Sequence, residues 1–202
     1  MEYRTYVPPT YLEPSEIIAI IEAIPKVSLH IERDTLLLKV LWQTGGRITE
    51  VLELIPKRIG DTSLSLRNLK QKPSAPPYKE TYIKPELSKE LRKYCLRMSE
   101  NDYVFKPNRK PTGHLSRFYV NWLLGKAARI VNVKRINTRT GDFSFAWPHL
   151  FRHSCAMYIL DKTGSTELAQ RQLGHARITT TQGYAVLKLE KSRKMLGDLE
   201  WE

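Results

Sequence analysis

A helical period of apolar residues runs through this sequence and is interrupted once by a period of two. Residues 14–24, 33–46 and 48–55 carry the helical period, and proline or glycine closes each segment. Thr49 is expected to cap the third of these helices. In residues 58–84, "SLSLRNL" and "KETYIK" alternate in side-chain character and are joined by the proline-rich "KPSAPPY", which predicts a hairpin. We therefore expect an α+β fold that is mostly α-helical, with a small antiparallel β-sheet or hairpin.

Helical patterns return after the hairpin and continue to the end of the chain. Leu115, Phe118 and Trp122 are expected to form the buried stripe of one helix. Residues 102–105 are expected to form a short strand, and residues 134–145 are expected to form a loop because they show no period. The remaining helices are expected at 86–99, 148–164, 165–174 and 186–199.

The organisation expected from these patterns is a single domain with two extensions. Residues 1–14 contain three prolines and three tyrosines and are expected to form an extended N-terminal arm. Residues 15–184 are expected to form the domain. Residues 185–202 are expected to form a C-terminal amphipathic tail, which would dock on a neighbouring subunit or pack on its own subunit.

The charge balance indicates a polyanionic partner. Lys plus Arg number 33 against 21 Asp plus Glu, giving a formal charge of +12 and a pI near 9.7. Nucleic acid is the first candidate partner, an anionic membrane the second, and a merely basic surface the plain alternative. The longest apolar run, "IIAII", is far shorter than the roughly 20 residues of a membrane span. Cys95 and Cys155 are isolated, which fits a reducing interior, so we expect a cytoplasmic protein that works where DNA or RNA is found.

Four short motifs follow one another in an order that carries more information than any one of them. They are "TGGRITEVLEL" (44–54), "LRNLKQK" (66–72), "PHLFRH" (148–153) and "LGHARITTTQGY" (173–184). Their order is an arginine, a hairpin lysine, His-x-x-Arg, Leu-Gly-His, and a tyrosine nine residues later. This combination resembles the catalytic domain of the tyrosine recombinase (phage integrase) family, and the resemblance runs from about Thr44 to Tyr184.

The chemistry of a DNA phosphodiester explains why such residues would be needed. Nucleophilic attack adds charge to oxygens that are already negative, so fixed donors must meet that charge. Arginine suits the task because its planar fork donates two parallel bonds and stays protonated. Arg47 and Arg152 are the candidates, and the resemblance implies that both bind the scissile phosphate. His149 lies three residues before Arg152, so both project from one face of the expected helix.

The resemblance implies roles for the other motif residues. His149 matches an acid/base or phosphate-contacting histidine, and His175 a histidine that hydrogen-bonds the phosphate. Glu50 is expected to hold Arg47 in place, and His153 to support the site.

A lysine on the hairpin would deliver a proton to the departing 5′ oxygen. Lys70 is the favoured candidate for this role, and Lys72 competes with it because the motif aligns loosely there.

Tyr184 completes the expected set as the nucleophile. A tyrosine hydroxyl has a pKa near ~10 and attacks only when nearby charge favours the phenolate or a base accepts its proton. The resemblance implies a covalent 3′-phosphotyrosyl intermediate, which conserves bond energy so that strands rejoin without ATP. The residues imply no metal and no cofactor.

Further basic residues lie in segments that are expected to face DNA or, alternatively, to be a solvated charged surface. Contacts to phosphates from such residues position a protein on DNA without specifying sequence. They are Lys106, Arg109, Lys110, Lys134, Arg135 and Arg139.

Several alternatives remain open from the sequence alone. A type IB topoisomerase shares the chemistry, a non-enzymatic DNA-binding regulator shares the surface, and an RNA-binding protein would share only the charge. The resemblance also implies an N-terminal core-binding domain, which these 202 residues are expected to lack. It further implies a homo-tetramer on paired double-stranded DNA sites, while the free protein could be a monomer.

Overall fold

The computed structural model describes residues 11–69, 76–108, 113–136 and 141–174. It contains seven α-helices in these ranges and two antiparallel two-stranded sheets. The helices are α1 (Pro14–Glu22), α2 (Ile31–Thr44), α3 (Ile48–Leu52), α4 (Pro85–Cys95), α5 (Arg117–Ile130), α6 (Pro148–Thr163) and α7 (Thr166–Leu173). The strands are β1 (Ser63–Arg67), β2 (Tyr78–Tyr82), β3 (Lys134–Ile136) and β4 (Phe143–Phe145), and two 3₁₀ turns cover Ile24–Lys26 and Pro56–Arg58.

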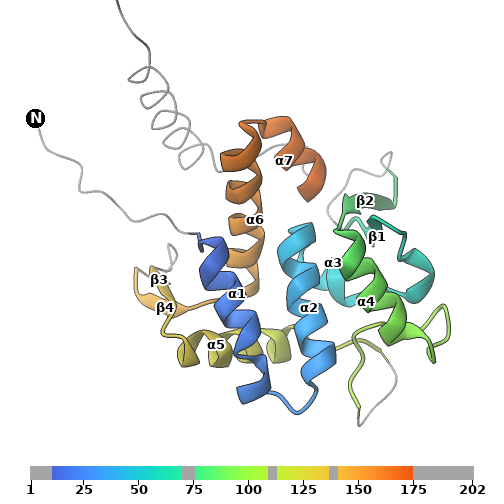
Figure 1. The fold of residues 1–202 in the computed structure, drawn as a ribbon, viewed down its shortest axis with the longest axis horizontal. Helices are drawn as coiled ribbons and strands as arrows, with labels where there is room; N and C mark the ends of the chain where they lie inside the picture. Colours follow the sequence, from blue (N-terminus) through green and yellow to red (C-terminus); the bar gives the residue numbers. More distant parts are fainter. Residues whose placement is uncertain (1–10, 70–75, 109–112, 137–140, 175–202) are drawn as a thin grey trace, which may run out of the picture.

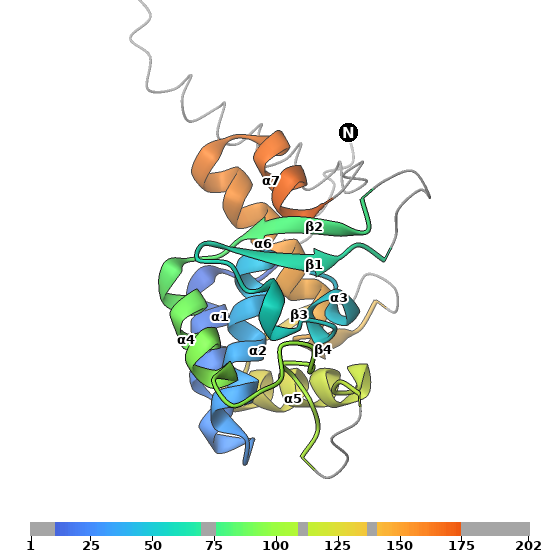
Figure 2. The same ribbon diagram turned by 90° about the vertical axis from the view of Figure 1, so that its right-hand side faces the viewer.

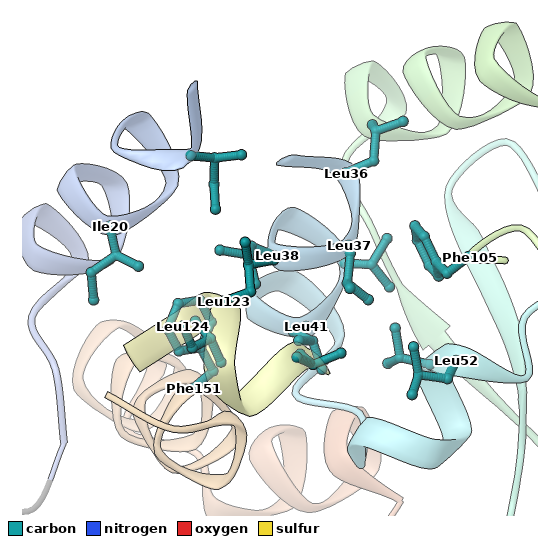
Figure 3. Packing of buried hydrophobic residues seen from close by; sticks show 14 of the residues in the cluster. Ile20, Leu36, Leu37, Leu38, Leu41, Leu52, Phe105, Leu123, Leu124 and Phe151 are labelled. Carbon is teal, nitrogen blue, oxygen red and sulfur yellow. The ribbon is translucent and has the colours of Figure 1, made fainter. Parts of the chain in front are cut away.

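Helix α2 lies at the centre of the fold (Figure 1) and contacts α1, α3, α4 and α6. Its apolar residues recur so closely that they face several neighbours, and Leu37, Leu38 and Leu41 are at most 1% exposed. Figure 3 shows these leucines between side chains from α1, α5 and α6 on one side and Leu52 and Phe105 on the other. The core is therefore built around one helix rather than around a sheet.

The two sheets lie on opposite sides of the helical core (Figure 1). In the larger hairpin, Ser63 pairs with Tyr82 and Arg67 with Tyr78. Figure 2 shows this hairpin crossing the molecule below α7, and β2 contacts α7 directly. The hairpin therefore delivers side chains of β2 to the region where α2, α3, α6 and α7 converge.

The expected mostly helical α+β class is confirmed, but four local expectations were wrong. Helix α3 begins at Ile48 with Arg47 as its N-cap, so Thr49 does not cap it. Residues 102–105 form no strand. The Val104 N–H donates to the Leu54 carbonyl at 2.9 Å, but a single bond of this kind does not make a strand ladder. Residues 134–145 contain the β3–β4 hairpin, whose three-residue strands are too short to display a period.

The fourth wrong expectation concerns the buried face of α5. Phe118 is 81% exposed and Trp122 is 43% exposed, although Leu115 before the helix is buried. The helix instead buries a smaller stripe at i, i+3 and i+4 spacing, namely Val120, Leu123, Leu124, Ala127 and Ala128. The large aromatic side chains predicted the wrong buried face, because the smaller aliphatic residues form the face that packs on the core.

The segment before α1 is anchored where the structure describes it. Leu12 is 1% exposed, and its N–H donates to Oγ of Ser154 at 2.7 Å. The last residues of the expected arm thus pack on α6, while residues 1–10 and the expected tail lie outside the described residues. Within the described ranges, no helix has the length and apolarity that a membrane crossing requires.

Candidate functional site

A sharp turn after α2 places Arg47 at the start of α3. Gly45 has φ of +55°, and a Cβ built on it would lie 2.3 Å from Cδ2 of Leu173. A side chain at this position would therefore be strained and would collide with α7. The glycine allows the chain to turn sharply against α7, and this turn places Arg47 at the start of α3.

Glu50 fixes the position of Arg47. Its side chain is 0% exposed, and Oε1 accepts from Nη1 of Arg47 at 2.7 Å. The other carboxylate oxygen, Oε2, accepts from the backbone N–H of Arg47 at 3.0 Å. Glu50 therefore caps the helix from its third residue, in the manner of a capping box, and holds the Arg47 guanidinium. The Arg47 side chain remains 24% exposed.

Arg152 lies in the second turn of α6 and is 4% exposed. Its Nη1 donates to the carbonyl of Gly45, and its Nη2 donates to the carbonyl of Leu173 at 3.1 Å. Arg152 therefore joins the turn before Arg47 to the last residue of α7. The two arginines predicted from the sequence, Arg47 and Arg152, therefore lie in one region, because Arg152 binds the main chain at Gly45, two residues before Arg47.

Lys79 is a further member of this region that the sequence reasoning missed. Its side chain is 8% exposed, and Nζ lies 2.8 Å from Oε2 of Glu50. The same Nζ donates to the carbonyl of Leu173 at 2.8 Å. The available signal was the period of two in β2, because Lys79 shares the inward face with buried Thr81. A lysine on the buried face of a strand is uncommon and indicates a specific partner.

We call Arg47, Glu50, Lys79, Arg152 and the Leu173 carbonyl the site network. Arg47 and Lys79 pair with its one carboxylate, and Arg152 joins it through the Leu173 carbonyl, so these named groups carry a formal charge of +2. Such an excess of positive charge in a partly buried region favours binding of an anion.

The pKa values of the buried pair reflect this arrangement. Burial alone raises the pKa of Glu50, but the ion pair with Lys79 and the hydrogen bonds from Lys79 and Arg47 outweigh it, so the pKa lies below its ordinary value. The pKa of Lys79 is also lowered, because burial and the charges of Arg152 and Arg47 outweigh the attraction of Glu50. Glu50 is therefore ionised at neutral pH.

The two histidines of α6 occupy different environments. His149, in the first turn, is exposed. His153 is half-buried, and its ring meets the Tyr11 ring edge-on with centroids 6.3 Å apart. Burial, with a smaller effect of His149, lowers the pKa of His153. The expected roles, His149 as an acid/base or phosphate-contacting residue and His153 as a supporting residue, stay predictions.

Neither cysteine has the environment of an activated nucleophile. Burial raises the pKa of the Cys155 thiol to about 12, and the nearby Arg152 only partly offsets this effect. Burial likewise raises the pKa of Cys95 to about 11. A thiol reacts as its thiolate, so these two residues are packing groups at neutral pH.

Other nominated residues lie outside the described ranges, and their roles stay predictions. The turn at Leu173 and Gly174 ends the described part of the chain directly before His175. The residues concerned are Lys70, Lys72, Arg109, Lys110, Arg139, His175 and Tyr184.

The three remaining basic candidates make contacts within the chain. Lys106 pairs with Asp102 at 2.8 Å, and Lys134 lies over the Phe145 ring at 5.1 Å. Arg135 pairs with Glu16, and its Nε donates to the carbonyl of Tyr11 at 2.8 Å. Arg135 thus ties β3 to α1, and its expected DNA contact stays a prediction.

Solved structures resemble this fold at low sequence identity. The crystal structure of XerA recombinase gives a TM-score of 0.72 at 24% identity, covering 97% of this chain and 67% of that one. XerH site-specific recombinase bound to palindromic difH substrate gives 0.71 at 22% identity, covering 94% and 53%. These likenesses establish the expected catalytic-domain fold.

Sequence comparisons lead to the same group of proteins. Tyrosine recombinase XerD of Staphylococcus saprophyticus is 26% identical over 199 residues, covering 94% of this chain and 62% of the relative. Tyrosine recombinase XerC of Xanthomonas campestris is 37% identical over 65 residues, covering 32% and 20%. The chain thus spans about three-fifths of the length of the XerD relatives it matches. The phage integrase family profile matches residues 10–191, which is most of the sequence, and the chain belongs to that family.

Proposed function

We propose that this chain is the catalytic part of a site-specific DNA recombinase that cleaves and rejoins strands through a 3′-phosphotyrosyl intermediate. The observation that carries the proposal is the site network, in which Arg47 and Arg152 converge with a net charge of +2. The motif resemblance supports the proposal, because it implies a phosphate-binding His175 and a nucleophilic Tyr184 in the sequence that follows α7. A phosphodiester is the anion that this set of donors suits.

In the proposed step, the oxygen of Tyr184 attacks the phosphorus and the bond to the 5′ oxygen breaks. The phenolic proton leaves to a base, for which His149 is the candidate, and the departing 5′ oxygen takes a proton from Lys70 or Lys72. Arg47 and Arg152 meet the charge that develops on the non-bridging oxygens. The reverse reaction, with a different 5′ hydroxyl as nucleophile, rejoins the strand without ATP.

The rest of the chain is proposed to serve this reaction on double-stranded DNA. Residues 15–184 form the catalytic domain, and the tail at 185–202 contacts a neighbouring subunit in a tetramer on two DNA sites. Lys106, Lys134 and the basic residues near them would bind phosphates and make the affinity depend on salt. We propose a cytoplasmic, DNA-associated location, because the free thiols Cys95 and Cys155 fit a reducing compartment.

Covalent capture on nicked duplexes tests the proposal. A target is first selected by binding from a random duplex library, and a nick beside the cleavage point lets a short fragment leave so that the adduct accumulates. We expect wild type to form a protein–DNA adduct that survives denaturing gel electrophoresis and that Tyr184→Phe lacks, while both shift the DNA on a native gel. Equal absence of adduct from both proteins, with binding retained, would establish a binding module instead.

A further inference from the structure

Lys79 makes three contacts that join separate elements of the site network. Its Nζ lies 2.8 Å from Oε2 of Glu50 on α3 and donates to the carbonyl of Leu173 on α7 at 2.8 Å. Its aliphatic stem lies against Gly174, where a Cβ would be 2.3 Å from Cδ of Lys79. Gly174 has φ of +65°, so this position suits glycine both by conformation and by space. The strand residue therefore touches the turn immediately before His175.

We propose that Lys79 is a positioning residue for strand cleavage. It acts through Glu50 on the Arg47 guanidinium, and through the Leu173 carbonyl on the turn that leads to His175. Arg152 donates to the same carbonyl at 3.1 Å, so one oxygen links the lysine to the second arginine. This inference rests on the proposed function and adds a residue that the motif resemblance did not assign.

The geometry favours positioning over proton donation to the substrate. An ammonium has three N–H donors, and two of those of Lys79 are engaged by Glu50 and the Leu173 carbonyl. The side chain is only 8% exposed, whereas a proton donor must reach the departing oxygen directly or through one water. Lys79 therefore holds the surrounding groups, and the donor role stays with Lys70 or Lys72.

The first test compares Lys79→Met with a matched substitution in another lysine–glutamate pair. Lys39 pairs with Glu90 at 2.6 Å on the surface, with side chains 34% and 45% exposed, so Lys39→Met removes an ion pair away from the site. We expect Lys79→Met to slow single-turnover adduct formation about 10- to 100-fold, the effect of misplacing reacting groups by about 1 Å. DNA affinity should change less than about threefold, since one indirect positioning contact is lost rather than a phosphate contact.

In the same assay, Lys39→Met should stay within about twofold of wild type, as expected for an exposed pair, and Lys79→Arg should recover part of the loss because it keeps the charge. A wild-type rate in Lys79→Met would overturn the proposal. If Lys79→Met does not fold, Lys79→Gln takes its place, because its amide keeps a donor while losing the charge.

A substrate with sulfur in place of the bridging 5′ oxygen separates positioning from proton donation. A thiolate leaves without protonation because its pKa is far lower than that of an alcohol. We expect this substrate to restore the rate of whichever alanine variant, at Lys70 or Lys72, lacks the proton donor. It should not restore Lys79→Met. Recovery of Lys79→Met would mean that Lys79 itself donates the proton and would overturn the positioning role.

Hydrogen exchange in the absence of DNA keeps this inference separate from the proposed function. Peptides covering residues 47–52 and 168–174 should exchange faster in Lys79→Met than in wild type and in Lys39→Met. Unchanged exchange would overturn the link even if the protein cleaves DNA. Faster exchange in Lys79→Met, together with the absence of an adduct from wild type, would instead reject the recombinase function while retaining the contact.

Discussion

The two ends of α2 carry buried charged networks of opposite design. At its start, Arg33 is 4% exposed and pairs with fully buried Asp34 at 2.8 Å. Arg33 also donates to the hydroxyl of Tyr119 at 2.9 Å and to the carbonyl of Lys106 at 3.2 Å, and the Tyr119 and Ser28 hydroxyls donate to Asp34. We call this group the Arg33 network. Beyond the other end of α2 lies the site network.

The difference between the networks lies in their charge balance and their access to solvent. The Arg33 network matches one cation with one anion inside the protein, whereas the site network sets three cations against one carboxylate. The site network also leaves Arg47 24% exposed. A buried ion pair with balanced charges contributes to the stability of the fold. A solvent-accessible group with excess positive charge has repulsion between its cations, and a bound anion reduces that repulsion.

The largest effect should come from breaking the balanced network. Asp34→Asn leaves the buried Arg33 without its counter-charge, and loss of one partner of a buried pair costs about 3–5 kcal/mol. The free energy of unfolding, measured by urea titration at pH 7, should fall by that amount. A loss below about 1 kcal/mol would show that the Arg33 network does not stabilise the fold and would remove one side of the comparison.

A smaller and pH-dependent effect is expected from Glu50→Gln. The amide keeps an acceptor and water can reach Arg47, so we expect a loss of about 2–3 kcal/mol at pH 7, at the upper end of the cost for a hydrogen bond to a charged group. The folded pKa of Glu50 lies below its ordinary value of 4.5. Its contribution is therefore present above pH 4.5 and is lost as the pH falls through the folded pKa.

Urea titrations of wild type and Glu50→Gln across this pH range measure the effect. The difference between the two proteins should shrink in acid. A difference that is constant with pH would mean that the carboxylate charge does not hold the site network.

Two glycines at helix ends sharpen the role of Lys79 in the site network. Gly174 and Gly164 have φ of +65° and +67°, but a Cβ on Gly164 would meet nothing within 4 Å. Gly164→Ala should therefore cost only the backbone strain, about 1 kcal/mol, and Gly174→Ala about 1–2 kcal/mol because the Lys79 stem must also move. Thermal unfolding of both variants measures the difference. Equal costs would show that Lys79 does not press on this turn.

The smallest effect should be stabilisation by a simple anion. Sulfate should raise the free energy of unfolding of wild type by about 1 kcal/mol at a few times its Kd, because it binds the folded site network. Arg47→Gln should lose most of this response, whereas Asp34→Asn should keep it, as measured by thermal unfolding in sulfate against chloride at equal ionic strength. A sulfate response that is kept in Arg47→Gln and lost in Asp34→Asn would mean that the anion depends on the Arg33 network and not on the site network.

Much of this fold could be predicted from local sequence patterns. The helical periods with their proline and glycine boundaries correspond to α1, α2, α6 and α7, and the period of two corresponds to the β1–β2 hairpin. The strands β3 and β4 escaped notice because three residues carry too little pattern. The exposed Phe118 and Trp122 of α5 show that apolar character alone does not identify the buried face of a helix.

For the site, the sequence nominated Arg47, Glu50 and Arg152 through motif order and the chemistry of phosphate binding. The family resemblance also assigned Glu50 to Arg47, a pair only three residues apart in the sequence. The family, the fold class and this part of the network were therefore determined by the sequence itself.

Only the tertiary structure decided that Lys79 belongs with these residues. Lys79 and Leu173 are 94 residues apart, and Gly45 and Arg152 are 107 apart. No local period encodes such contacts, because they depend on how β2, α6 and α7 pack against the end of α2. Packing also decided which charges are balanced inside the protein and which are left to meet an anion, since a charge acquires its surroundings only when distant elements remove it from water.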